Sequence, residues 1–216
     1  MKKNVNKQGQ SLAELFFKKF NKEVLREIQM ATYKWDTKVF TKKITELIRN
    51  LIQSSTFDKK DDSQTEYYRI DVIGYKTINE DTTEEFKSVK YDLRKAPPLW
   101  ALDIAVEHEN NQNGWMDEFI KLCYIRCPLR VVIGYNYCDK RKDPELGDEI
   151  KVKYAMNVIE QISNKTKFRI IDEDQEFLII LGNCHSKDGN KDYDDFGYKG
   201  YIIKSSAKGD LQLKTI

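Results

Sequence analysis

The chain has 216 residues, of which 40% are hydrophobic and 33% are charged. This length suits one sizeable core and excludes a disulfide-stapled mini-protein, and the composition excludes a disordered or fibrous chain. A mean hydropathy of -0.68 excludes an integral membrane protein, since no apolar run approaches the roughly 20 residues that a spanning helix needs. Charged residues rather than an apolar signal core follow Met1, so we expect a cytoplasmic protein with no membrane partner.

The net charge of +2 conceals an uneven distribution. Residues 1–60 hold 14 Lys and Arg and six Asp and Glu, a charge of +8. The other residues hold 23 Lys and Arg and 29 Asp and Glu, a charge of -6. A basic segment of this kind is typical of a surface that contacts phosphate groups, although a solvated lysine-rich helix has the same composition. Both interpretations of residues 1–60 stay open on composition alone.

The first part of the chain has the periodicity of helices. Between residue 11 and about residue 54, apolar residues recur at steps of three and four, with a break near Trp35 and Asp36. Ser11 and Glu14 have the spacing of a capping box, which marks a helix start. Residues 58–64 are polar and predict a loop. We expect a single domain over residues 1–216, with a basic helical segment at 1–60 and an α/β core at 65–216.

From residue 67 the pattern changes to that of strands and then alternates between strands and helices. Enrichment in β-branched and aromatic residues predicts a three-strand meander over 67–76, 85–93 and 100–109. A helix over 114–126 and a buried central strand over 129–137 follow. The remainder predicts a helix over 144–163, whose inward stripe is Ile150, Tyr154, Val158, Ile159 and Ile162. Closing strands are predicted at 168–171, 177–184 and 200–204.

Acidic residues interrupt two strands where apolar residues are expected. Asp71 lies between Ile70 and Val72 in the first predicted strand. In the strand over 100–109, alternation places Leu102, Ile104, Val106 and His108 on one face and Asp103, Ala105, Glu107 and Glu109 on the other. A buried carboxylate is costly unless it is paired or coordinates a metal. Converging carboxylates without obvious cations favour a hard divalent ion, Mg²⁺ or Mn²⁺.

Two other interpretations of these acids stay open. Asp71 can pair with a cation of the meander, such as Arg69, Lys90 or Arg94. Glu107 and Glu109 can face solvent on a half-exposed antiparallel sheet.

The order of these motifs resembles the PD-(D/E)xK nuclease superfamily. The resemblance covers about residues 40–137 and rests on RIDVIGY, LDIAVEHEN, MDEFIKL and LRVVIGY. It implies a restriction endonuclease-like α/β (α+β) fold, in which helices flank a mixed β-sheet core behind an N-terminal helical segment. It also implies that Asp71, Glu107 and the backbone carbonyl of His108 bind Mg²⁺ or Mn²⁺, with Glu46 of the preceding helix as a further acidic ligand.

The sequence departs from the superfamily at the third motif position, where many members have lysine and this chain has Glu109. The resemblance implies that Glu109 serves as general base, or that Lys121 of the following helix replaces the missing lysine. The implied function is metal-dependent endonucleolytic hydrolysis of DNA, with the basic helices on the DNA backbone and a homodimer by analogy. The alternative is a catalytically inactive protein of this fold that binds nucleic acid or another protein, which the missing lysine favours.

The histidine and cysteine residues suggest no further site. By alternation His108 points away from the acids, so we expect it to be packed or hydrogen-bonded. The four cysteines, Cys123, Cys127, Cys138 and Cys184, lack the paired spacing of a zinc site. Cys123 and Cys127 lie one helical turn apart among apolar neighbours, which predicts small buried side chains.

Overall fold

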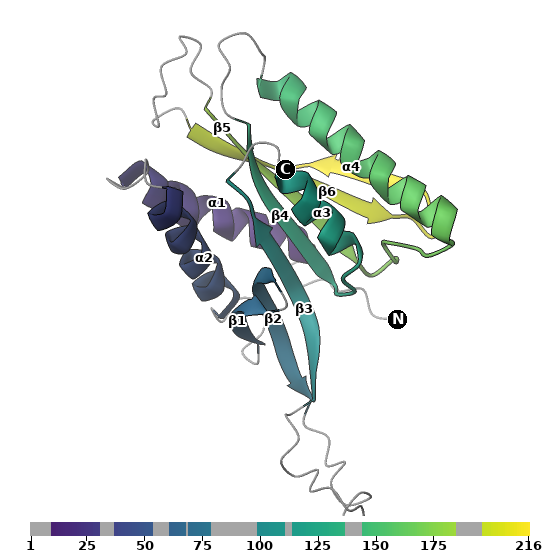
Figure 1. The fold of residues 1–216 in the computed structure, drawn as a ribbon, viewed down its shortest axis with the longest axis horizontal. Helices are drawn as coiled ribbons and strands as arrows, with labels where there is room; N and C mark the ends of the chain where they lie inside the picture. The colour runs from purple at the N-terminus through teal and green to yellow at the C-terminus, as the bar shows by residue number, and fades with distance from the viewer. Residues whose placement is uncertain are drawn as a thin grey trace, which may run out of the picture.

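The computed structural model describes residues 10–30, 37–53, 61–67, 69–78, 99–110, 114–136, 144–184 and 196–216. Within these ranges the helices are α1 (Leu12–Met30), α2 (Thr37–Gln53), α3 (Trp115–Cys123) and α4 (Pro144–Thr166). The strands are β1 (Asp61–Tyr67), β2 (Ile70–Ile78), β3 (Leu99–His108), β4 (Leu129–Asn136), β5 (Glu176–Cys184), β6 (Phe196–Ser205) and β7 (Leu211–Thr215). The helices flank one central sheet (Figure 1), so the expectation of a mixed sheet between helices is confirmed.

The sheet has seven strands in the order β1-β2-β3-β4-β5-β6-β7. Strands β1, β2 and β3 form an antiparallel meander, whereas β3, β4 and β5 run parallel. Strands β6 and β7 then continue the sheet in antiparallel fashion. Parallel neighbours need a crossover connection, and α3 and α4 supply the two crossovers between β3, β4 and β5.

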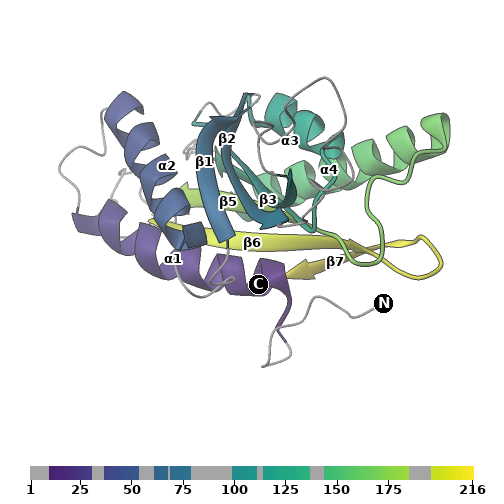
Figure 2. The same cartoon turned by 90° about the horizontal axis from the view of Figure 1, so that it is seen from below.

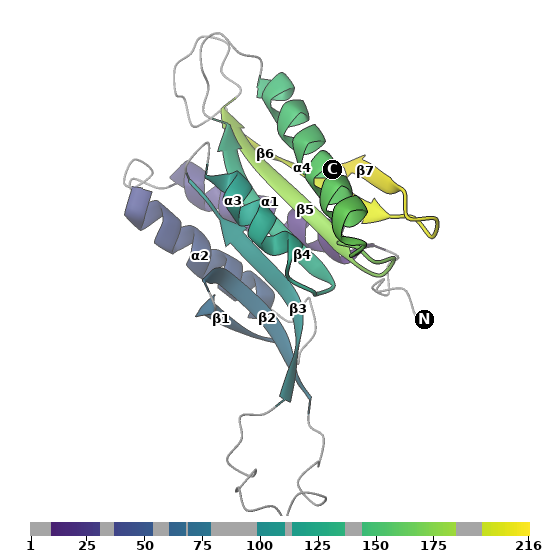
Figure 3. The same cartoon turned by 45° about the vertical axis from the view of Figure 1, so that its right-hand side comes forward.

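The sheet divides the core into two apolar layers. Helices α1 and α2 pack on one face, against Val72, Val106 and Val131, whereas α3 and α4 pack on the other, against Ala105 and Val132. Figure 2 shows α1 below the sheet and α4 above it, and Figure 3 shows α3 and α4 in front of strands β4 and β5. Strand β4 is buried along its whole length, which confirms its prediction as a central strand. No helix within the described ranges is long and apolar enough to cross a membrane.

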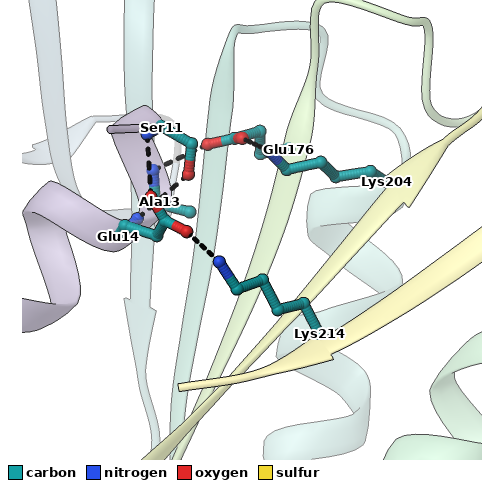
Figure 4. A network of polar contacts seen from close by, with 6 residues as sticks. All are labelled: Ser11, Ala13, Glu14, Glu176, Lys204 and Lys214. Carbon is teal, nitrogen blue, oxygen red and sulfur yellow. Dashed lines mark hydrogen bonds and ion pairs between the residues drawn. The ribbon is translucent and has the colours of Figure 1, made fainter. Parts of the chain in front are cut away.

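Helix α1 begins at a capping box that the sheet reinforces (Figure 4). The backbone N–H of Ser11 donates to Glu14 Oε2 at 3.0 Å and the N–H of Glu14 donates to Ser11 Oγ at 3.3 Å, as predicted. Glu176 of β5 accepts the N–H of Ala13 at 2.7 Å. Carboxylates suit the first turn of a helix because its N–H groups lack partners within the helix.

Two lysines of the last strands complete this network (Figure 4). Lys204 pairs with Glu176, and Lys214 pairs with Glu14. The hydrogen bond from Lys214 is the main reason why the pKa of Glu14 lies below its ordinary value. The start of α1 is therefore bound to β5, β6 and β7, at the opposite edge of the sheet from β1.

The first strand of the meander lies where the sequence predicted a loop. Strand β1 covers Asp61–Tyr67, with the polar sequence DDSQTEY, and pairs with β2 at the edge of the sheet. An edge strand has only one paired side and tolerates polar residues, so it lacks the apolar alternation on which the prediction depended. The predicted strand at 85–93 lies outside the described residues, and β2 pairs directly with β3.

A β-bulge in β3 changes the faces that its side chains occupy. Gly74 pairs with Ile104 but Tyr75 pairs with Leu102, so Asp103 is the additional residue. Leu102 consequently packs on the α3 face with Ala105, and the prediction that it shares a face with Ile104 is wrong. Asp103 forms an ion pair with Lys76 at 2.8 Å. From Ile104 to His108 the predicted alternation holds.

Helix α4 buries only part of the predicted stripe: Ile159 is buried, and Val158 and Ile162 pack against the same core. Ile150 and Tyr154 are 60% and 53% exposed, and the side that packs against the sheet carries Val152, Ala155 and Ile159. Asp148 lies on that buried side with no exposed surface. The segment predicted as a strand at 168–171 adopts no regular structure, although Ile170 and Ile171 are buried.

Asp148 is buried because three other elements supply hydrogen-bond donors to it. Asn183 of β5 donates to both carboxylate oxygens, at 3.0 and 3.1 Å. Tyr201 of β6 donates to Oδ2 at 2.8 Å, and Asn136 of β4 donates to Oδ1. A carboxylate with this many donors can remain in the interior, and it joins α4 to β4, β5 and β6.

Candidate functional site

The two acidic strand motifs meet at one end of the meander. Asp71 is the second residue of β2 and Glu107 is the residue before the end of β3. The antiparallel register pairs Val72 with Val106, so its continuation by one residue places Asp71 opposite Glu107. Asp71 Oδ2 accepts the backbone N–H of His108 at 2.8 Å. The structure thus brings together two of the acids that the sequence singled out.

Glu107 is a buried carboxyl group beneath α3. Its side chain is only 1% exposed, and its face of β3 also carries Ala105. The pKa of Glu107 is raised to about 8, mainly by burial and also by the neighbouring charges of Asp71 and Glu118, while the hydrogen bond with Lys121 opposes the rise. The alternative in which Glu107 faces solvent is therefore wrong. A buried acid surrounded by acids favours a cationic partner.

That partner is Lys121 of α3. Its Nζ lies 2.6 Å from Glu107 Oε1, forms a second ion pair with Glu118, and donates to the backbone carbonyl of Arg69 at 2.6 Å. Burial alone would lower the pKa of Lys121, but its hydrogen bonds with the two glutamates outweigh burial and raise this pKa. The structure therefore brings Lys121 to Glu107, although the two residues lie on different elements.

The packing of α3 explains this position. Phe119, Leu122 and Cys123 are buried against the sheet, which holds the helix above β3 and β4. Glu118 and Lys121 are three residues apart and lie on one side of the helix, where Lys121 pairs with both Glu107 and Glu118. The sequence interpretation did not assign a role to Glu118, and this spacing was the signal that could have identified it.

Arg69 contributes its backbone rather than its side chain. It lies in the turn between β1 and β2 and has a φ of 64°, a value that non-glycine residues adopt mainly in tight turns. Its side chain is exposed, whereas its carbonyl oxygen accepts the hydrogen bond from Lys121. The start of β2 therefore takes part in the site through this carbonyl as well as through Asp71.

Glu109 lies at a different place from Glu107. It follows the end of β3, and its backbone N–H donates to the carbonyl of Ile133 at 3.0 Å. Its carboxyl group lies against Gly114, the N-cap of α3, where an added Cβ would lie 3.2 Å from Glu109 Cδ. Lys121 is seven residues further along the helix, about 10 Å at the rise of an α-helix. The carboxyl group of Glu109 therefore lies at the N-terminal end of α3, where the helix dipole stabilises a negative charge.

The side chain of His108 belongs to the opposite layer, as alternation predicted. It is 5% exposed, and its Nε2 lies 2.8 Å from Tyr135 Oη. Its ring lies 6.0 Å from that of Phe40 on α2. Burial lowers the pKa of His108 to about 3, so the ring is neutral. Any ligand function of His108 therefore belongs to its backbone.

Glu46 does not accompany the other acids. Its side chain is exposed on α2, whose buried residues Ile44 and Ile48 pack on the face opposite α3. The side chains of Glu107 and Lys121 lie on the α3 face. The expectation that Glu46 adds a metal ligand therefore lacks support from the geometry, and we place no ligand there.

The N-terminal end of α2 nevertheless lies beside the acidic end of β3. Asn110, which follows β3, donates to Thr41 Oγ1, and Phe40 contacts His108. The outer side of the two N-terminal helices carries exposed basic residues: Lys18, Lys22, Arg26, Lys38, Lys42 and Arg49. The basic helices are therefore connected directly to the strand that carries Glu107.

The donors at this site fit a hard divalent cation rather than zinc. Within the described residues, no group of three or more His, Cys, Asp and Glu side chains is arranged to hold a metal ion. Mg²⁺ usually needs only one or two protein carboxylates, because waters and substrate phosphate supply its other ligands. The adjacent carboxylates of Asp71 and Glu107 meet that requirement. Cys123 and Cys127 are buried thiols whose pKa burial raises to about 12, as expected for packing residues.

Comparison with known proteins adds no relative. The chain matches no protein-family model, and a search of curated proteins finds no match. The fold and the geometry of the site therefore carry the functional proposal.

Glu107 also makes the stability of the protein depend on pH. Its pKa is about 8 in the folded chain against an ordinary value of 4.5, so the folded state binds this proton more tightly. The corresponding stabilisation is complete below pH 4.5 and is lost as pH rises towards about 8. In metal-free buffer, Glu107→Gln should therefore be more stable than the wild type at alkaline pH by about 1–2 kcal/mol.

Urea denaturation at several pH values measures this difference. The advantage of Glu107→Gln should shrink as the pH falls towards the ordinary pKa of a glutamate. Glu149→Gln is the matched control, since Glu149 is 63% exposed and should show no such trend. A glutamine variant less stable than the wild type across the whole range would show that burial does not penalise the charged form of Glu107.

Proposed function

We propose that this protein is a metal-dependent endonuclease that hydrolyses DNA phosphodiester bonds, with a restriction endonuclease-like core. The observation that carries the proposal is the buried Glu107 carboxyl group, adjacent to Asp71 and in contact with Lys121. Perturbed carboxyl groups beside a lysine are typical of catalytic sites. A purely structural strand does not require this arrangement.

The order of elements supports the same proposal. Helix α2, the antiparallel strands β1, β2 and β3, helix α3 and the parallel strand β4 follow one another along the chain. The resemblance to the PD-(D/E)xK superfamily was drawn from the same succession of helix, meander, helix and strand. In the structure Asp71 lies on the second strand of the meander, β2, instead of the first, and Glu107 lies on β3. The fold by itself would not assign a function, so the argument depends on the site.

In the proposed reaction each residue of the site would have a separate role. Asp71 and Glu107, with the backbone carbonyl of His108, would hold Mg²⁺ or Mn²⁺. When bound, the ion supplies a Lewis acid that polarises the scissile phosphate and lowers the pKa of a water ligand. Lys121 provides the positive charge that many superfamily members obtain from the motif lysine. Glu109, whose carboxyl group lies at the start of α3, would serve as general base.

The N-terminal helices would bind the DNA backbone. Their exposed lysine and arginine side chains lie on the layer whose α2 contacts the end of β3. Contacts of this kind are independent of sequence and weaken steeply as the salt concentration rises. A homodimer would allow both strands of a duplex to be cut, because a two-fold assembly presents two equivalent sites.

A cleavage assay tests the proposal. Supercoiled plasmid and single-stranded oligonucleotides are incubated with the full chain and Mg²⁺, Mn²⁺ or a chelator. We expect nicked or linear products with metal, none with the chelator, and none from Asp71→Ala. Asp103→Ala is the matched control, because Asp103 is an aspartate of the neighbouring strand β3 that pairs with Lys76. Equal cleavage by wild type and Asp71→Ala would show that this site is not catalytic.

The position of Glu109 favours one alternative, a catalytically inactive protein of the same fold that binds nucleic acid or another protein. Its carboxyl group packs at Gly114, a position that stabilises α3 without any catalytic role. Salt-sensitive DNA binding in a gel-shift assay, without cleavage under any metal condition, would support a nucleic-acid-binding protein over the nuclease.

A further inference from the structure

The ammonium group of Lys121 occupies a cage of three oxygen atoms. These are Glu107 Oε1 at 2.6 Å, the carbonyl oxygen of Arg69 at 2.6 Å, and Glu118 Oε2. The oxygens come from β3, from the turn before β2, and from α3 itself. An ammonium has three N–H donors, and the three oxygens match them in number.

The same oxygens form a donor set for a hard divalent cation. Two carboxylates and a backbone carbonyl are the groups that Mg²⁺, Mn²⁺ and Ca²⁺ prefer. Glu107 is also a ligand in the proposed metal site, so the ammonium and the metal ion require the same carboxylate. Since like charges at such short range repel strongly in a buried site, the two cations exclude each other.

An exchange of cations requires that Lys121 can move away while Glu107 stays in place. Glu107 is only 1% exposed and cannot leave its position on β3, whereas the Lys121 side chain is 31% exposed. Lysine has a flexible four-carbon stem, and its charge can move into solvent while the stem remains against the protein. Lys121 lies in the last turn of α3, where this movement does not require the helix to shift.

We propose that Lys121 holds the cation position in the metal-free chain and is displaced when a divalent ion binds, with Glu118 becoming a metal ligand. The inference rests on the metal site of the proposed function and adds Glu118 and the Arg69 carbonyl to it. The displaced ammonium becomes available to a phosphate group only after the metal has bound. Metal binding is thereby coupled to binding of the scissile phosphate. In the metal-free protein Lys121 remains paired with the glutamates and does not contact the DNA phosphate.

Amine acylation measures the displacement directly. The full chain is labelled with an acylating reagent at trace level, with Mn²⁺ or with chelator, and modification of each lysine is quantified by mass spectrometry. We expect saturating Mn²⁺ to accelerate acylation of Lys121 by roughly 5- to 150-fold, the usual range of coupling between two linked events. Lys153 is the internal control, because it is 77% exposed and pairs with Glu149 in the same helix. Unchanged or slower labelling of Lys121 in Mn²⁺ would overturn the proposal.

Two variants test the exchange through Mn²⁺ affinity, measured by calorimetry without DNA. Mn²⁺ binding and release of Lys121 are linked equilibria, so each favours the other by the same factor. Lys121→Met removes the competing ammonium group and should tighten Mn²⁺ binding by that factor. Lys153→Met should leave the Mn²⁺ affinity unchanged. Glu118→Gln should weaken Mn²⁺ binding if Glu118 is a ligand. If Glu118 only orients the lysine, its replacement will leave the affinity unchanged or increase it, which contradicts the proposal. Circular dichroism confirms that each variant is folded.

These measurements separate the inference from the nuclease proposal. A chain that cuts DNA with Mn²⁺ but shows no release of Lys121 overturns the exchange and leaves the nuclease assignment intact. A chain that releases Lys121 with Mn²⁺ but never cuts DNA supports the exchange and contradicts the nuclease assignment. Absence of Mn²⁺ binding overturns the exchange, whatever the result of the cleavage assay.

Discussion

Replacing Glu107 with glutamine is expected to reduce Mg²⁺-dependent DNA cleavage by about 10²–10³-fold or more, the scale on which loss of one preorganised catalytic group acts. Glutamine has almost the same shape, so it fills the buried space beneath α3 without a cavity. It lacks the charge that a divalent ion requires from this position. Initial rates of plasmid nicking under saturating Mg²⁺ measure the effect.

The same variant separates catalysis from folding. Glu107→Gln should be more stable than the wild type at alkaline pH, because it removes a buried carboxyl group whose pKa is raised to about 8. A loss of activity in a more stable protein cannot be attributed to unfolding. Stability sacrificed for function is common at active sites.

The control for this prediction is Glu176→Gln. Glu176 is also a buried glutamate, 8% exposed, but it binds Lys204 and the start of α1. Its replacement should lower stability while the cleavage rate of the folded protein stays near that of the wild type. Retention of wild-type cleavage by Glu107→Gln would remove Glu107 from the catalytic machinery.

Asp148→Ala is expected to lower the free energy of unfolding by about 3–5 kcal/mol, the cost of removing one partner from a buried charged network. The substitution leaves the amides of Asn136 and Asn183 and the hydroxyl group of Tyr201 in the interior without their acceptor. For a chain of this length the midpoint of thermal unfolding should fall by about 10 °C or more. Thermal and urea denaturation measure both quantities.

The neighbouring residue provides a matched control. Glu149→Ala should change stability by no more than about 0.5 kcal/mol, because Glu149 is exposed and its ion pair with Lys153 lies on the surface of α4. Below its melting temperature, Asp148→Ala should retain cleavage, since the Asp148 cluster belongs to α4, β4, β5 and β6 rather than to β2 and β3. A stability equal to that of the wild type would mean that water replaces the carboxylate.

Three predictions that depended on neighbours in the chain were confirmed. Ser11 and Glu14 form the capping box at the start of α1, because its geometry involves only residues three apart. Strand β4 was recognised from a continuous apolar run, since a strand buried on both faces has no polar side. The burial of His108 away from Glu107 followed from the two-residue period of a strand, which holds between Ile104 and His108.

The predictions that failed depended on contacts between distant segments. Strand β1 is polar because an edge strand needs little burial, so its sequence resembles a loop until β2 pairs with it. The β-bulge at Asp103 arises from pairing with β2, and it moves Leu102 to the other face. On α4 the apolar residues Ile150 and Tyr154 remain exposed, because the donors that make Asp148 an interior residue come from β4, β5 and β6.

The candidate site shows the same division. Asp71 and Glu107 were identifiable as residue types, because acids inside strands stand out from the local pattern, whereas Lys121 was named only through the resemblance to the superfamily. Their meeting at one point depends on the register of β2 against β3 and on the packing of Phe119 and Leu122, which brings α3 over the acids. Local patterns record the conformation of a segment and its apolar side, whereas contacts between segments depend on the free energy of the whole assembled core. The position of Lys121 between Glu107 and Glu118 depends on contacts between segments, and the proposed chemistry depends on this position.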